Sequence, residues 1–161
     1  MSVLSQAEMF YDAYEVLQES NNAFVEAENA QSADSAEAKF GRCHTMQVEV
    51  VCLSFSVELY VKALHIAISD ESPRGHDTLE LFRKLPENVR DTLYTFPSVN
   101  KYGWSFSQFE DEIGAISKSF VKWRYSYEED SLWFNTYFAL VFIEALRFAI
   151  ASACKYKAEA E

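Results

Sequence analysis

The sequence predicts an all-α protein, an antiparallel bundle of about five or six helices in a single domain spanning residues 1–161. Apolar residues recur every three or four positions along most of the chain, which is the spacing of helix faces that pack on one another. Only 4 glycines and 3 prolines are present, too few for the many turns of an all-β fold. Hydrophobic residues make up 49% of the chain, enough for one buried core.

The first helix is predicted over residues 3–30. Its apolar stripe is narrow, so we expect it on the outside of the bundle. The stripe consists of Phe10, Tyr14, Leu17 and Phe24. Residues 1–39 contain eight acidic residues and one lysine, which gives this segment a net charge of −7. Residues 1–35 are therefore interpreted as an acidic N-terminal helix packed on the bundle.

A second helix is predicted from about residue 36 to residue 69, again with an apolar period near 3.6. Residues 70–76 contain proline and glycine and are predicted to be a loop. Asp77 is expected to cap a short helix because Glu80 follows it at the position of a capping box. Pro86 is predicted to open the next helix at its first position, and that helix runs to about residue 95.

Residues 97–104 are predicted to be a loop, and Ser105 with Gln108 matches a second capping box. This box opens a helix over residues 105–128, whose apolar residues alternate at three and four positions. They are Phe106, Phe109, Ile113, Ile116, Phe120, Trp123 and Tyr127. Such a spacing is typical of a helix packed lengthwise on other helices.

The last helix is predicted over residues 132–156 and is apolar enough for a membrane span to be considered. Asn135, Glu144 and Arg147 lie inside it, and each is costly in lipid. We therefore expect a core or dimer-interface helix and no membrane. Because the helix is apolar on more sides than one bundle covers, we expect a homodimer that buries part of it and the end of helix 105–128.

The densest polar chemistry lies where helix 105–128 ends, at Arg124, Tyr127 and Glu128. The second helix carries Glu58 and Lys62 one turn apart, and two interpretations of them remain open. They form an ordinary pair on a solvated face, or Glu58 faces Arg124 across the bundle and binds its guanidinium. Arg124 is expected to be buried or half-buried and paired with Glu58 or Glu128.

His76 directly precedes the Asp77 cap, and a loop residue stacked on a helix end is the favoured interpretation. The three histidines are far apart in sequence, and none has a second ligand at i+3 or i+4, so no metal site is predicted. The chain has no glycine-rich phosphate loop and no nucleophile elbow, so no cofactor is predicted.

The net charge of −11 argues against loose, non-specific binding to nucleic acid. Most of this charge lies in residues 1–39, so the rest of the chain repels phosphate only weakly. The N-terminal residues show no basic region ahead of an apolar run, so a cytoplasmic location is expected.

Three stretches together resemble the HEPN superfamily of small helical-bundle domains. They are Ser-Val-Glu-Leu-Tyr-Val-Lys-Ala-Leu at residues 56–64, Gly-His-Asp at residues 75–77, and Phe-Val-Lys-Trp-Arg-Tyr-Ser-Tyr-Glu at residues 120–128. The resemblance covers about residues 45–150 and implies an HEPN-like bundle. Members of this superfamily occur in prokaryotic toxins, phage-defence proteins and RNA-processing enzymes.

Active HEPN ribonucleases use an arginine followed four to six residues later by a histidine, and two protomers pair these motifs across a cleft. Arg124 matches the arginine. The histidine positions hold Glu128, Glu129 and Asp130. The usual group that acts with arginine on the scissile phosphate is therefore missing.

The resemblance thus implies a non-catalytic, dimeric binding or interaction module in a prokaryotic defence or toxin–antitoxin setting, with RNA or a partner protein as its ligand. The alternative is a divergent, metal-independent endoribonuclease that uses Arg124 with His76, Tyr127 or Glu128. The missing histidine and the acidic surface favour the first interpretation.

Overall fold

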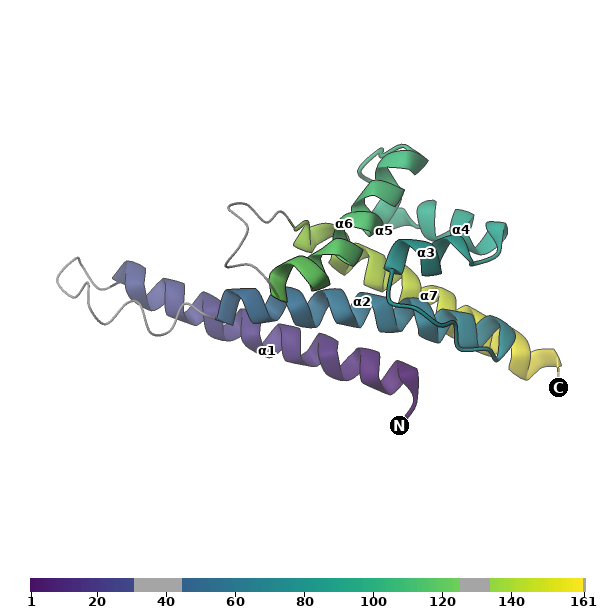
Figure 1. The fold of residues 1–161 in the computed structure, drawn as a ribbon, viewed down its shortest axis with the longest axis horizontal. Coiled ribbons are helices and arrows are strands. Elements are labelled where there is room, and N and C mark those ends of the chain that lie inside the picture. Colours follow the sequence, from purple (N-terminus) through teal and green to yellow (C-terminus); the bar gives the residue numbers. More distant parts are fainter. Residues whose placement is uncertain (31–44, 125–133, 161) are drawn as a thin grey trace.

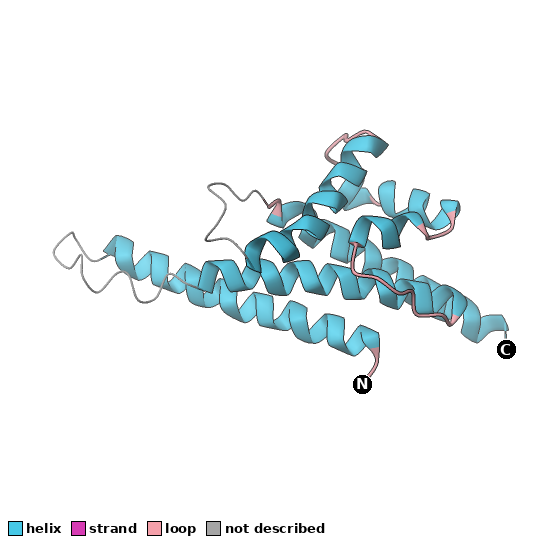
Figure 2. Cartoon of the chain, viewed as in Figure 1, coloured by secondary structure: helices cyan, strands magenta, loops and turns pink. Residues whose placement is uncertain are grey.

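The structure is a computed structural model, which describes residues 1–30, 45–124 and 134–160. These residues form seven helices and no strand, so the predicted all-α bundle is confirmed (Figures 1 and 2). The helices are α1 (Val3–Ala30), α2 (Thr45–Ser69), α3 (Thr78–Arg83), α4 (Glu87–Tyr94), α5 (Pro97–Asn100), α6 (Phe106–Arg124) and α7 (Thr136–Ala160).

Helix α2 is the centre of the bundle. Figure 1 shows α1 running antiparallel along one side of α2, with α3 to α6 on the opposite side and α7 crossing behind. Helix α2 is consequently buried on more than one face. Its most buried apolar side chains are Leu53, Val57, Tyr60, Val61 and Leu64, each no more than 1% exposed.

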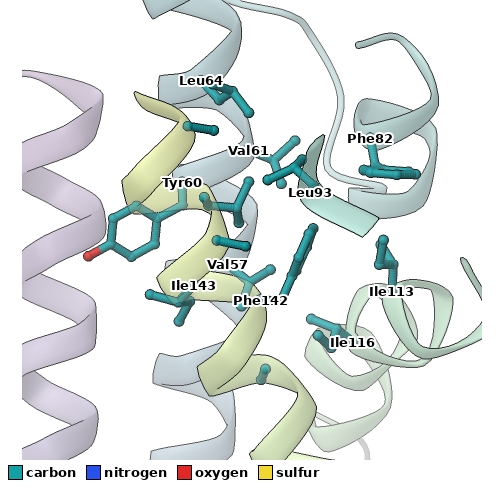
Figure 3. Packing of buried hydrophobic residues seen from close by; sticks show 14 of the residues in the cluster. Val57, Tyr60, Val61, Leu64, Phe82, Leu93, Ile113, Ile116, Phe142 and Ile143 are labelled. Carbon is teal, nitrogen blue, oxygen red and sulfur yellow. The ribbon is translucent and has the colours of Figure 1, made fainter. Parts of the chain in front are cut away.

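Aromatic side chains join α3, α6 and α7 on the other side of α2. The ring of Phe109 lies 5.6 Å from the rings of Phe82, Phe138 and Phe142, in edge-to-face arrangements. Such contacts add to the area that the rings bury. Figure 3 shows Phe142 between α2 and the α6 residues Ile113 and Ile116, so one core connects the three elements.

Both predicted capping boxes start helices. Asp77 accepts hydrogen bonds from Leu79 N and Glu80 N at 3.0 and 3.1 Å, which caps α3. At the start of α6, Gln108 N donates to Ser105 Oγ and Ser105 N donates to Gln108 Oε1. These contacts satisfy backbone donors that have no partner inside a helix.

The predicted boundaries near Pro86, Pro97 and Asn135 differ from the structure. Pro86 is the N-cap of α4 and not its first residue. Residues 97–104 are not all loop, because Pro97 opens the four-residue helix α5. Helix α7 starts at Thr136 and not at residue 132, since Asn135 accepts a hydrogen bond from Phe138 N at 3.0 Å and so acts as a capping residue.

Other predicted boundaries lie outside the described residues. They are the start of the second helix before residue 45 and the end of helix 105–128 beyond residue 124.

The end of the last helix is described and also differs from the prediction. This helix continues to Ala160, four residues further than predicted.

In the part of the chain that the structure describes, two helical segments are long and apolar enough to cross a membrane, Val48–Ser69 and Thr136–Glu159. Within the bundle, 56% of an 18-residue window of the first and 50% of such a window of the second are buried. Packing between helices therefore accounts for much of their apolar composition.

Candidate functional site

The middle of α2 carries a buried carboxylate, that of Glu58, which is only 3% exposed. Its Oε1 atom accepts hydrogen bonds from Lys62 Nζ at 2.8 Å and from His76 Nδ1 at 3.0 Å. The Lys62 side chain is 12% exposed and the His76 side chain is 79% exposed. We call these three residues the Glu58 cluster. In this cluster, the nearly buried ammonium group of Lys62 and the exposed ring of His76 both bind the buried carboxylate of Glu58.

The predicted pair between Glu58 and Lys62 is confirmed, but the solvated face predicted with it is wrong for Glu58. The reason is tertiary. The loop after α2 folds back and places His76 on Glu58, 18 positions away in sequence. Figure 1 shows this loop returning along α2 before α3 begins.

The backbone on both sides of His76 fixes the position of its ring. Gly75 has a φ of +107°, which side-chain-bearing residues rarely adopt, so a glycine suits this turn. Asp77 caps α3, and Thr78 N donates to Ser117 Oγ of α6 at 3.0 Å. His76 is therefore held between a turn and a helix start that is anchored on α6.

The contact defines which nitrogen of His76 donates. An ionised carboxylate can only accept, so Nδ1 carries the proton that points at Glu58. In the neutral ring, Nε2 is then the acceptor, on a side chain that is 79% exposed. A carboxylate orients the imidazole of a general base in the same way. The bond between His76 and Glu58 also holds the loop against α2. The geometry therefore suits either a general base or a structural contact.

The remaining predicted site residues are not placed by the structure. Arg124 is the last residue of α6, and its side chain lies outside the described part of the chain, as do Tyr127 and Glu128 altogether. The pairing of Arg124 with Glu58 or Glu128 therefore stays a prediction. Arg124 lies two turns beyond Ser117, roughly 10 Å further along α6.

A second polar group, which no spacing in the sequence predicts, joins α1, α2 and α7. Arg147 of α7 forms an ion pair with Glu8 of α1, and its Nε atom donates to the hydroxyl of Tyr60 at 2.8 Å. The guanidinium also lies over the ring of Tyr11, 4.2 Å from its centroid. We call these four residues the Arg147 cluster. Figure 3 shows the Tyr60 hydroxyl pointing toward α1.

The Arg147 cluster compensates a charge on an otherwise apolar helix. Burial lowers the pKa of the Arg147 guanidinium, but Glu8 and Tyr60 more than offset this, so its pKa is raised. Burial also raises the pKa of Tyr60. Glu8 and Arg147 are 139 positions apart, so no spacing rule connects them. The sequence did contain one sign of this cluster, because an arginine within a largely apolar helix requires a partner for its charge.

Two carboxylates near the start of α6 differ in their surroundings. Glu110 accepts two hydrogen bonds from Arg83, at 2.9 and 3.2 Å, and this contact lowers the pKa of its carboxyl group. Glu112 has a buried Oε2 atom with no hydrogen-bond partner among the described residues. Burial raises the pKa of Glu112.

Comparison with protein families identifies the domain to which most of the chain corresponds. Residues 42–148 match the model of the HEPN domain family, which covers more than half of the chain and runs from just before α2 into α7. No curated protein matches the chain, and no solved structure does. Helix α1 lies outside the matched residues.

Proposed function

The chain belongs to the HEPN domain family, and from this membership we propose that it is a non-catalytic HEPN module that dimerises and binds a partner protein. We place it in a prokaryotic defence or toxin–antitoxin setting, because the HEPN superfamily, which the sequence resembles, includes proteins of those systems. RNA is the second candidate ligand.

The observation that carries the proposal concerns the histidines. Glu128, Glu129 and Asp130 stand where a histidine would follow Arg124. Among the described residues, His65 Nε2 is hydrogen-bonded to the carbonyl of Leu81, and His76 is bonded to Glu58. His65 is thus held by a contact inside the bundle, and no histidine follows Arg124 in the sequence, which supports a role without catalysis.

The surface of α7 supports the dimer. Phe148 is 53% exposed and borders an apolar groove of about 200 Å³ between α4 and α7. The groove is also lined by Leu64, Ile68, Val89, Thr92, Ala149, Ser152 and Ala153. In a two-fold dimer, Phe148 of each copy can enter the groove of the other, which is how isologous interfaces are built. The proposed interface then buries part of α7.

The test is a ribonuclease assay of the purified protein on single-stranded and structured RNA without added metal. Cleavage needs one group that activates the 2′-hydroxyl and another that stabilises charge on the phosphate. We expect no cleavage by the wild type above that of Arg124→Ala and His76→Ala. Cleavage by the wild type that both substitutions abolish would overturn the non-catalytic proposal.

One observation favours the second candidate, a divergent endoribonuclease. The bond between His76 Nδ1 and Glu58 orients an exposed imidazole, which is the group missing after Arg124. In this alternative His76 would take the proton and Arg124 would stabilise the phosphate. The Glu58→Gln variant should then cleave RNA more slowly than the wild type, because a neutral amide orients the imidazole less strongly.

A further inference from the structure

We propose that the groove between α1 and α7 is a docking site for a basic, amphipathic segment of a partner protein. This inference deepens the proposed function, on which it rests, because it names the surface that binds the partner and the chemistry of the partner. The groove has a volume of about 310 Å³. Its lining includes Tyr11 of α1 and, from α7, Tyr137, Leu140, Val141, Glu144 and Arg147.

The groove offers apolar surface along two turns of α7. Leu140 and Val141 line it, and Tyr137 stands at one end with 53% of its area exposed. The ring of Tyr137 packs edge-on against Tyr102 at 5.3 Å, which fixes an aromatic wall before any partner arrives. From Tyr137 to Glu144 the groove extends for about 10 Å, the length of two turns of a docking helix.

The charges around the groove select the partner. Among the described residues that line it, Arg147 is the one cation, and its charge is already balanced by Glu8 while its guanidinium stacks on Tyr11. Glu144 lines the groove and is exposed. On α1, Glu15 lies one turn beyond Tyr11 and is exposed. The groove therefore repels phosphate and acidic peptides and attracts lysine or arginine.

The same charges disfavour a second copy of this chain as the occupant. The chain carries a net charge of −11, and residues 1–39 alone carry −7. A second copy that placed its own acidic α1 in this groove would bring carboxylates next to Glu144, which is unfavourable, whereas the described lining of the groove with α4 contains no charged residue. The proposed dimer instead uses Phe148 and the groove with α4, further along α7. The two surfaces are thus separate, and each can be altered alone.

The test uses a synthetic probe because the natural partner is not identified. The probe is a fluorescent 16-residue peptide of leucine and lysine arranged with helical periodicity, and its control has glutamate in place of lysine. Fluorescence anisotropy measures binding to the full-length protein at low and moderate salt. We expect the basic peptide to bind, and the acidic peptide with the same apolar pattern not to bind.

Two variants place the binding site. Glu144→Lys reverses a charge in the groove, and Glu71→Lys makes the same change on an exposed loop after α2. We expect Glu144→Lys to weaken the basic peptide roughly tenfold and Glu71→Lys to weaken it by about twofold or less. Tyr137→Ala should also weaken it, because the aromatic wall is lost. Circular dichroism confirms that each variant is folded.

Three results would overturn the inference. Equal weakening by Glu144→Lys and Glu71→Lys would mean that the peptide senses only the overall charge. Equal binding of the acidic peptide would remove the charge argument. Loss of a dimer in Tyr137→Ala or Glu144→Lys would assign the groove to a second copy.

Failure here is distinguishable from failure of the proposed function. An inactive, dimeric protein that ignores the peptide refutes the groove alone. A protein that binds the peptide and cleaves RNA refutes the non-catalytic function alone.

Discussion

Replacing Glu58 by glutamine tests whether the Glu58 cluster stabilises the fold. The substitution keeps the shape of the side chain and one acceptor oxygen but removes the charge that faces Lys62. The Lys62 side chain is only 12% exposed, so its ammonium group would stay close to the core without a counter-charge. Truncating one member of a buried charged pair is costly for this reason.

The magnitude follows from the exposure of the two partners. A hydrogen bond to a charged group contributes about 1.5–3 kcal/mol when it is largely buried, which describes Lys62. The bond to His76 lies at the surface and contributes about 0–1 kcal/mol. Because glutamine still accepts one bond, we expect a loss of about 2 kcal/mol. In a domain of this size that lowers the melting temperature by about 4–8 °C.

Thermal unfolding followed by circular dichroism measures this shift, and Glu144→Gln is the matched control. It makes the same chemical change on an exposed face of α7, so its effect should stay within about 0.5 kcal/mol. The double variant Glu58→Gln, Lys62→Met should lose less than the two single losses combined, since it leaves no buried charge unpaired. A Glu58→Gln variant as stable as Glu144→Gln would refute the reasoning.

Three further predictions follow from other parts of the molecule. Arg124→Ala should lower the melting temperature, because the free energy of unfolding falls by about 3–5 kcal/mol if the side chain is buried and paired; a variant as stable as the wild type would place Arg124 in solvent. Burial, with a smaller effect of Asp111, raises the pKa of Glu112 in the folded protein, so ionisation of Glu112 destabilises the fold as the pH rises through and above the ordinary carboxyl range. Glu112→Gln should therefore unfold at a higher temperature than the wild type at pH 7, and the difference should vanish below about pH 4; equal stability at pH 7 would contradict this. Phe148→Glu should give a monomer in light scattering at micromolar concentration, whereas Tyr156→Glu, on a 77% exposed side chain, should leave the dimer intact; a monomeric wild type would refute the dimer.

Local signals explain why the helices were predictable. The N-cap at Asp77 and the capping box at Ser105 act within four residues, so the sequence contains the whole interaction. Asn135 carried a similar signal, but the apolar run continues on both sides of it and hides the start of α7. Helix α5 is a single turn and has no apolar periodicity to detect, apart from Pro97 at its first position.

The candidate site was less predictable because its contacts are tertiary. Glu58 and Lys62 are one turn apart, and that pair was visible in the sequence. The bond from His76 to Glu58 depends on how the loop after α2 folds back, which no spacing specifies. Arg147 and Glu8 come from opposite ends of the chain, and the packing of both α1 and α7 against α2 brings them together.

Helix α1 links the fold to the proposed partner surface. It lies outside the residues that match the HEPN domain family, yet Ala7 and Tyr14 are buried in the same core as α2 and α7. Ser56 of α2 donates a hydrogen bond to the carbonyl of Ala7 at 3.0 Å, and Arg147 of α7 binds Glu8. These contacts hold α1 at a defined distance from α7, and the groove exists only because both helices are fixed. The proposed partner surface therefore combines α7 residues inside the matched range with Tyr11 of the acidic helix α1, which lies outside it.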